Sequence, residues 1–147
     1  MEIIKEPNPI LYQRSKEANA ADKANLKLLN EMFSYVKEHS GEAIGLSAVQ
    51  VGVPKRMCAI RFKVGNKNIA YKLINPRIIK RSPMLVEEEE GCLSTNEKVI
   101  VKRNSSVTVM AYDTIQGRTI IIEATGLLAR CLQHEIDHMD GILITKK

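Results

Sequence analysis

The chain has 147 residues, of which 44% are hydrophobic and 27% charged, and its net charge is +5 at pH 7. These values are typical of one globular domain, which we expect to span residues 1–147, and no apolar run approaches the roughly 20 residues that cross a bilayer. Aromatic residues make up only 4% and the basic residues are scattered among acids, so neither a membrane protein nor a specific nucleic-acid binder is expected.

The cysteines and the N-terminus indicate a reducing compartment. Cys58, Cys92 and Cys131 are an odd number without disulfide spacing, and residues 1–5 do not resemble a secretory leader. We therefore expect a cytoplasmic protein, of a bacterium or of a host cell if the chain is virus-encoded, with an organelle matrix left open.

Residues 1–21 are expected to form an extended lead-in with a turn. From Asp22, the expected N-cap, to about His39 the pattern is that of an amphipathic helix, which Ser40-Gly41 would end. Its apolar residues recur at three- and four-residue steps: Leu26, Leu29, Phe33 and Val36.

Residues 42–52 combine small residues with one long polar side chain, Gln50. Gly45 and Gly52 allow close backbone approach, and a buried Gln needs hydrogen-bond partners for both ends of its amide. These residues alone leave two interpretations open, a tight packing segment and a loop that lines a substrate site.

Residues 57–124 predict a series of short strands joined by turns. The closely spaced turns favour antiparallel hairpins over crossover units. The strands are expected at 57–63, 68–74, 77–80, 84–88, 99–103, 107–113 and 118–123, with turns at 65–66, 75–76, 82–83 and 116–117. The acidic run 87–90 is expected to point alternate side chains outward along its strand.

A last helix is expected to begin at Thr125 or Gly126 and to end at Asp140-Gly141, with a short strand at 142–144. In this helix His134 and His138 lie one turn apart on one face, about 6 Å between their Cβ atoms. Two imidazoles at this spacing can bind one metal ion, and Glu135 can reach a water bound to it.

A catalytic metal needs a third protein ligand, and the sequence offers several candidates, carboxylates among them. Cys131 lies about 10 Å along the helix axis from His138, too far to share an ion, so it is expected to line the pocket. Cys58 fits a strand of the core, and His39 fits the surface. Cys92, in a glycine-flanked segment, is therefore favoured as the third ligand.

Three separated motifs resemble the signature motifs of the peptide deformylases, in the same order: AIGLSAVQ (43–50), EGCLS (90–94) and QHEIDH (133–138). The resemblance covers essentially the whole chain. It implies an α+β fold with antiparallel β-sheets wrapped around a central metal-binding helix. It also implies a single catalytic domain that removes the N-formyl group from N-formylmethionyl peptides of nascent chains.

The resemblance assigns roles residue by residue. Cys92, His134 and His138 match the metal ligands of one divalent ion, with ferrous iron (Fe2+) expected physiologically and Ni2+, Co2+ or Zn2+ in a purified sample. Glu135 matches the general base of a metal-bound hydroxide that attacks the formyl carbonyl. The oxyanion donors would be Gln50 and the Leu93 N–H.

The family's substrate-binding positions can be assigned in the same way. They fall on Ile44, Gly45, Gly91, Leu127, Arg130 and Cys131. The partners implied are a formylmethionyl peptide and a transient contact with the ribosome, for an enzyme expected to be a monomer.

Some positions depart from the family pattern. Ala43 stands where Gly is usual, Ser47 replaces the commoner Ala, and residues 95–97 replace a proline-glycine turn. Few residues follow Gly141, so the chain resembles short-tailed members that lack the C-terminal helix. The sequence leaves two other functions open: a metalloprotease of the HExxH kind, and a metal-stabilised binding module without turnover.

Overall fold

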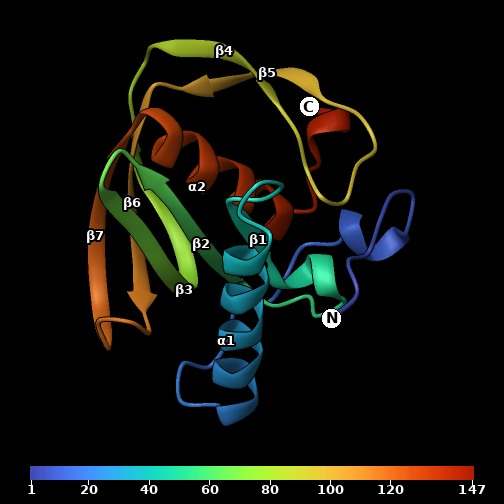
Figure 1. Ribbon diagram of the computed structural model, residues 1–147, viewed down its shortest axis with the longest axis vertical. Helices are drawn as coiled ribbons and strands as arrows, with labels where there is room; N and C mark the ends of the chain where they lie inside the picture. Colours follow the sequence, from blue (N-terminus) through green and yellow to red (C-terminus); the bar gives the residue numbers. More distant parts are fainter.

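The computed structural model describes residues 1–147 and confirms the α+β class (Figure 1). Its helices are α1 (Lys23–Glu38) and α2 (Gly126–Met139). A five-stranded antiparallel sheet has the order β1-β2-β3-β6-β7, and a separate hairpin pairs β4 with β5. The strands are β1 (Gly45–Ser47), β2 (Met57–Val64), β3 (Lys67–Arg81), β4 (Leu85–Glu90), β5 (Val99–Asn104), β6 (Ser106–Asp113) and β7 (Arg118–Thr125).

Helix α1 begins where the sequence predicts. The Asp22 side chain accepts a hydrogen bond from the Ala24 N–H and caps the helix, which ends at Glu38 with His39 as its C-cap. Its buried face, with Leu29 and Val36 at its centre, packs on one face of the five-stranded sheet.

Helix α2 lies on the other face of that sheet. Alternation along β2 explains this, because Cys58 and Ile60 join the core under α2 whereas Met57 and Ala59 join the core under α1. The β4–β5 hairpin covers α2 from the opposite side (Figure 1). The expected arrangement, antiparallel sheets wrapped around the helix that carries the two histidines, is therefore confirmed.

The turn predicted at Asn75-Pro76 is wrong, because β3 continues through it from Lys67 to Arg81. The pairing of β3 with β6 shifts register between Ile74 and Arg77, so a bulge absorbs the irregularity. Asn75 has φ of +53°, which Asn tolerates, and its side chain exchanges two hydrogen bonds with the backbone of Ala18.

The short strand predicted at 142–144 is also wrong. Leu143 and Ile144 are buried, but they pair with no strand, and a 3-10 helix runs from Ile144 to Lys146. Burial rather than strand pairing accounts for this apolar run. None of the helices is long and apolar enough to cross a membrane.

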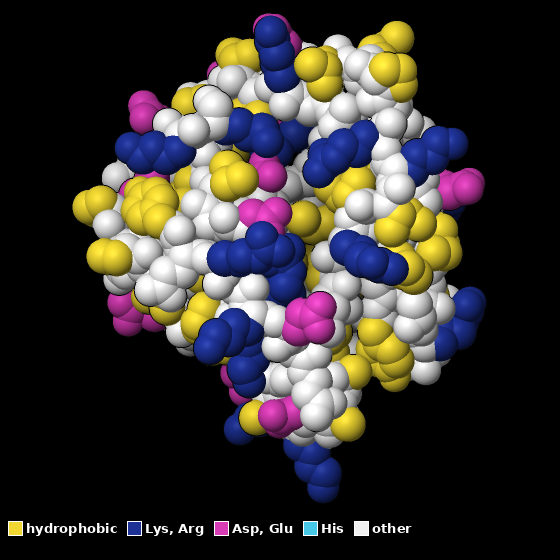
Figure 2. Space-filling model, turned by 180° about the vertical axis from the view of Figure 1, so that it is seen from behind, with side chains coloured by type: hydrophobic (Ala, Val, Ile, Leu, Met, Phe, Trp, Pro, Cys, Tyr) yellow, Lys and Arg dark blue, Asp and Glu magenta, His cyan; other side chains and the backbone are white.

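On the face turned away from the view of Figure 1, basic, acidic and hydrophobic side chains are interspersed (Figure 2). Lys and Arg therefore do not gather into one continuous patch on this face, which agrees with the mixed order of charges in the sequence.

Candidate active site

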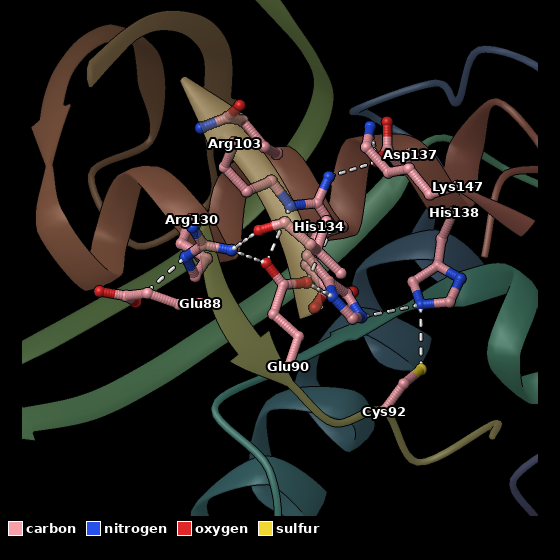
Figure 3. A network of polar contacts seen from close by, with 12 residues as sticks. Glu88, Glu90, Cys92, Arg103, Arg130, His134, Asp137, His138 and Lys147 are labelled. Atoms are coloured by element: carbon pink, nitrogen blue, oxygen red, sulfur yellow. Dashed lines mark hydrogen bonds and ion pairs between the residues drawn. The ribbon is translucent and has the colours of Figure 1, made fainter. Parts of the chain in front are cut away.

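The three predicted ligands meet at one point. Helix α2 carries His134 and His138 on one face, and Cys92 lies two residues after the end of β4 (Figure 3). The His138 Nε2 atom lies 3.3 Å from the Cys92 Sγ atom and 3.2 Å from the His134 Nε2 atom. The three ligand atoms all lie within 4.8 Å of one another, a spacing that suits a single metal ion.

The donor chemistry of this group also fits a cation. The His134 Nδ1 atom lies 2.9 Å from Glu90 Oε1, so a neutral His134 carries its proton on Nδ1 and directs the Nε2 lone pair toward His138 and Cys92. Lone pairs on two imidazoles and a thiolate repel one another unless a proton or a metal ion lies between them. The buried Nδ1 atom of His138 has no hydrogen-bond partner in the protein.

The other candidate ligands lie elsewhere. Cys58 is fully buried in the core, and His39 stacks on Tyr35 at the end of α1. Cys131 lines the same cleft as His134 but is not one of the converging ligands. The geometry thus agrees with the preference for Cys92.

Glu90 connects the histidine to a network of buried charges (Figure 3). Its carboxylate accepts hydrogen bonds from Arg103 at 2.9 and 2.8 Å and from Arg130, while Arg103 also pairs with Asp137 on α2. Burial alone would raise the pKa of Glu90, but hydrogen bonds from Arg103 and His134 outweigh it and hold the pKa well below its usual value.

This network also fixes the hairpin on α2. Arg130 donates to the carbonyl oxygens of Val86 on β4 and Val101 on β5, and its Nε lies 3.3 Å from Glu88. The side chains of the acidic run alternate between outward and inward positions only in part, because residues 87–89 are all exposed and Glu90 alone is buried. Sequence reasoning missed Arg103 and Glu90; the one signal was a basic residue on a strand that follows the acidic run.

Glu135 is 3% exposed and lies beside the converging ligands, in the wall of the cleft. Its Oε1 atom accepts a hydrogen bond from the Ser47 hydroxyl at 2.9 Å. Burial raises the pKa of Glu135, and the charge of His134 and the Ser47 hydrogen bond partly oppose that rise. A buried carboxyl with a raised pKa is suited to proton transfer near neutral pH.

Gln50, at 2% exposure, has partners for both ends of its amide, as its burial requires. Its Oε1 atom accepts from the Ser47 N–H at 2.9 Å, which turns its Nε2 atom toward Ser94 at 3.0 Å and Cys92 at 3.6 Å. The neighbouring Leu93 N–H forms no hydrogen bond within the protein. Two donors therefore lie close to Cys92.

A cleft of about 530 Å³ opens over these residues. All the positions predicted to contact substrate line it: Ile44, Gly45, Gly91, Leu127, Arg130 and Cys131. Thr95 and Asn96 line it as well, and Ala43 contributes to the wall without a positive φ.

One wall of the cleft is an edge strand. β1 pairs with β2 on one side only and is the last strand of its sheet. Its free edge offers backbone donors and acceptors to an extended chain.

Known proteins are similar to this chain in both sequence and fold. A family model described as polypeptide deformylase matches residues 1–147. A peptide deformylase of Agrobacterium fabrum is 42% identical over 139 residues, which cover 93% of this chain and 80% of the relative.

Solved structures that are similar to this chain are also those of peptide deformylases. A probable peptide deformylase of Synechococcus phage S-SSM7 superposes with a TM-score of 0.87 at 32% identity, covering 99% of this chain and 97% of that one. The peptide deformylase of Ehrlichia chaffeensis in complex with actinonin superposes with a TM-score of 0.90 at 36% identity. The match covers 99% of this chain and 87% of that one.

Proposed function

The chain belongs to the polypeptide deformylase family of hydrolases, and we propose that it removes the formyl group from N-formylmethionyl peptides of nascent chains. The observation that carries this proposal is the convergence of Cys92, His134 and His138 beside the buried Glu135. As one catalytic unit over residues 1–147, the chain would release formate and a free amino terminus.

The proposed ligands of one divalent ion are the Cys92 thiolate and the Nε2 atoms of His134 and His138. When bound, the ion lowers the pKa of a water and polarises the formyl carbonyl. A mixed thiolate and imidazole set suits iron and zinc alike. We propose Fe2+ as the physiological ion, with Ni2+, Co2+ or Zn2+ as substitutes in a purified sample.

Glu135 is proposed as the general acid and base. It takes a proton from the water that attacks the formyl carbon and delivers this proton to the leaving amine nitrogen, so that the carbon–nitrogen bond breaks. The Gln50 amide and the Leu93 N–H would donate to the oxygen that becomes negatively charged. Donors already oriented by Ser47 and the surrounding backbone stabilise this charge without reorganising.

The peptide is proposed to lie along the free edge of β1. Ile44 and Gly45 would pair with its backbone, and the α2 residues Leu127 and Cys131 would face the methionine side chain across the cleft. Arg130 is held by Glu90 and by backbone carbonyls, so its stem rather than its charge is available to the side chain.

Formate release tests the proposal. Protein purified without oxygen and loaded with Fe2+ is incubated with formyl-Met-Ala-Ser, and casein cleavage is followed in parallel. Formate release without casein cleavage is expected. Casein cleavage without formate would instead favour a metalloprotease, and neither activity in metal-loaded protein would favour a binding module.

A further inference from the structure

Ser47 lies at the end of β1, where the strand faces α2, and its side chain is completely buried. Its hydroxyl oxygen is 2.9 Å from Oε1 of Glu135 and 3.0 Å from the backbone oxygen of the same residue. The hydroxyl has one proton for these two acceptors. An ionised carboxylate is the stronger acceptor, so the proton goes to Oε1 whenever Glu135 is charged.

This contact makes the two carboxylate oxygens of Glu135 unequal. Oε1 is held by Ser47, whereas Oε2 faces Gly45, where a Cβ atom added to the glycine would lie only 2.7 Å away. Gly45 and Glu135 both line the cleft, and the oxygen that Ser47 leaves free is the one beside Gly45.

The backbone of Ser47 acts on Gln50 at the same time. Its N–H donates to Oε1 of Gln50, which directs the amide nitrogen of Gln50 toward Cys92 and Ser94. One residue of β1 therefore contacts the side chain proposed as the base and the side chain proposed as the oxyanion donor.

We propose that Ser47 is a positioning residue for the deformylation reaction: its hydroxyl holds Glu135 with Oε2 toward the substrate while its N–H holds Gln50. The proposal rests on the proposed function. It predicts that the hydroxyl acts on the chemical step, because Ser47 is too deeply buried to contact the substrate. A contact that lowers only the barrier of the chemical step changes kcat and leaves KM unchanged.

The test compares Ser47→Ala with the wild type in formate release, with metal content and thermal unfolding measured on the same samples. Ser15→Ala is the matched control, because Ser15 is 4% exposed and its hydroxyl has no partner in the protein. Rates are expressed per folded, metal-loaded molecule. We expect kcat of Ser47→Ala to fall about tenfold with KM and metal content unchanged, and Ser15→Ala to match the wild type.

Ser47→Thr is the second variant, because it keeps the hydroxyl, and its kcat is expected to exceed that of Ser47→Ala. An unchanged kcat in Ser47→Ala would overturn the proposal, as would a rise in KM alone, a loss of metal, or a kcat in Ser47→Thr as low as in Ser47→Ala. Absence of formate release by the wild type would instead contradict the proposed function itself.

Discussion

The Nδ1 atom of His134 lies 2.9 Å from the Glu90 carboxylate, which is buried among arginines. This contact joins the two parts of the site, because Glu90 ends β4 two residues before Cys92 and His134 lies on α2. A carboxylate on the outer nitrogen of a metal-binding histidine fixes the ring and raises its basicity as a ligand. Glu90 is therefore expected to affect both metal binding and stability.

Glu90→Gln should weaken metal binding about 10- to 100-fold, as loss of such an outer partner usually does. It should also destabilise the protein by about 3–5 kcal/mol, because Arg103 and Arg130 lose a buried charged partner. Chelator competition and urea unfolding measure the two effects. Glu87→Gln is the control, since that side chain is 56% exposed and pairs only with Lys102. Equal metal affinity in wild type and Glu90→Gln would contradict the role assigned to Glu90.

The same carboxylate predicts a pH dependence. The pKa of Glu90 is lowered in the folded protein relative to its ordinary value of 4.5, so its stabilising contribution is present above pH 4.5. This contribution is lost progressively as the pH falls below 4.5 toward the pKa that Glu90 has in the folded protein. The difference in unfolding free energy between wild type and Glu90→Gln should thus shrink with acidification. A difference that stayed constant from about pH 7 down to about pH 3 would rule this out.

Gly45→Ala should impair catalysis by crowding. The new Cβ atom would lie 2.7 Å from Oε2 of Glu135 and 3.0 Å from the Cys131 sulfur, distances that force the carboxylate to move. We expect kcat/KM to fall at least tenfold with metal content unchanged. Gly41→Ala, in the same cleft wall, is the control because no atom lies within 4 Å of its added Cβ. If both variants kept full activity, the cleft face of Glu135 would not be where the reaction takes place.

Glu135→Ala and Glu135→Gln should both bind metal as the wild type does, because Glu135 is not one of the converging ligands. Formate release should fall at least 100-fold, the usual contribution of a general acid–base residue. Metal analysis and formate assays on the same preparations provide the check. A variant that turned over at the normal rate would show that another group moves the proton.

The three cysteines should differ in reactivity. Burial raises the pKa of the Cys58 and Cys131 thiols well above the ordinary value, so they remain neutral and react slowly with alkylating reagents. Cys92 is only partly buried. In the folded protein at about pH 8, iodoacetamide should label Cys92 after metal removal and label it poorly when metal is bound. Mass spectrometry that found the same labelling of Cys92 in both forms would argue against its role as a ligand.

The sequence predicts the elements better than the contacts between them. The amphipathic helix after Asp22, the histidine helix and the antiparallel strands follow from local periodicity and capping, and the structure confirms them. The prediction of a turn at Asn75-Pro76 was wrong because the same residues also suit a bulge inside a long strand.

The contacts of the site depend on residues that are distant in the chain. Ser47 meets Glu135 across 88 positions, and Arg103 meets Glu90 across the hairpin. The periodicity of a sequence predicts local elements and does not predict such pairs, so they are found only in the folded structure. The hypothesis of a metal site with His134 and His138 as ligands and Glu135 as base could be formed from the sequence, because their spacing on one helix is a local pattern. Cys92 comes from a distant segment, and its role as the third ligand stays a prediction.

Anomalous diffraction from crystals grown under nitrogen with Fe2+ tests the central claim most directly. One strong iron peak is expected within bonding distance of the Cys92 sulfur and of the Nε2 atoms of His134 and His138. A peak elsewhere, or density with Cys92 turned away and another side chain in its place, would contradict it.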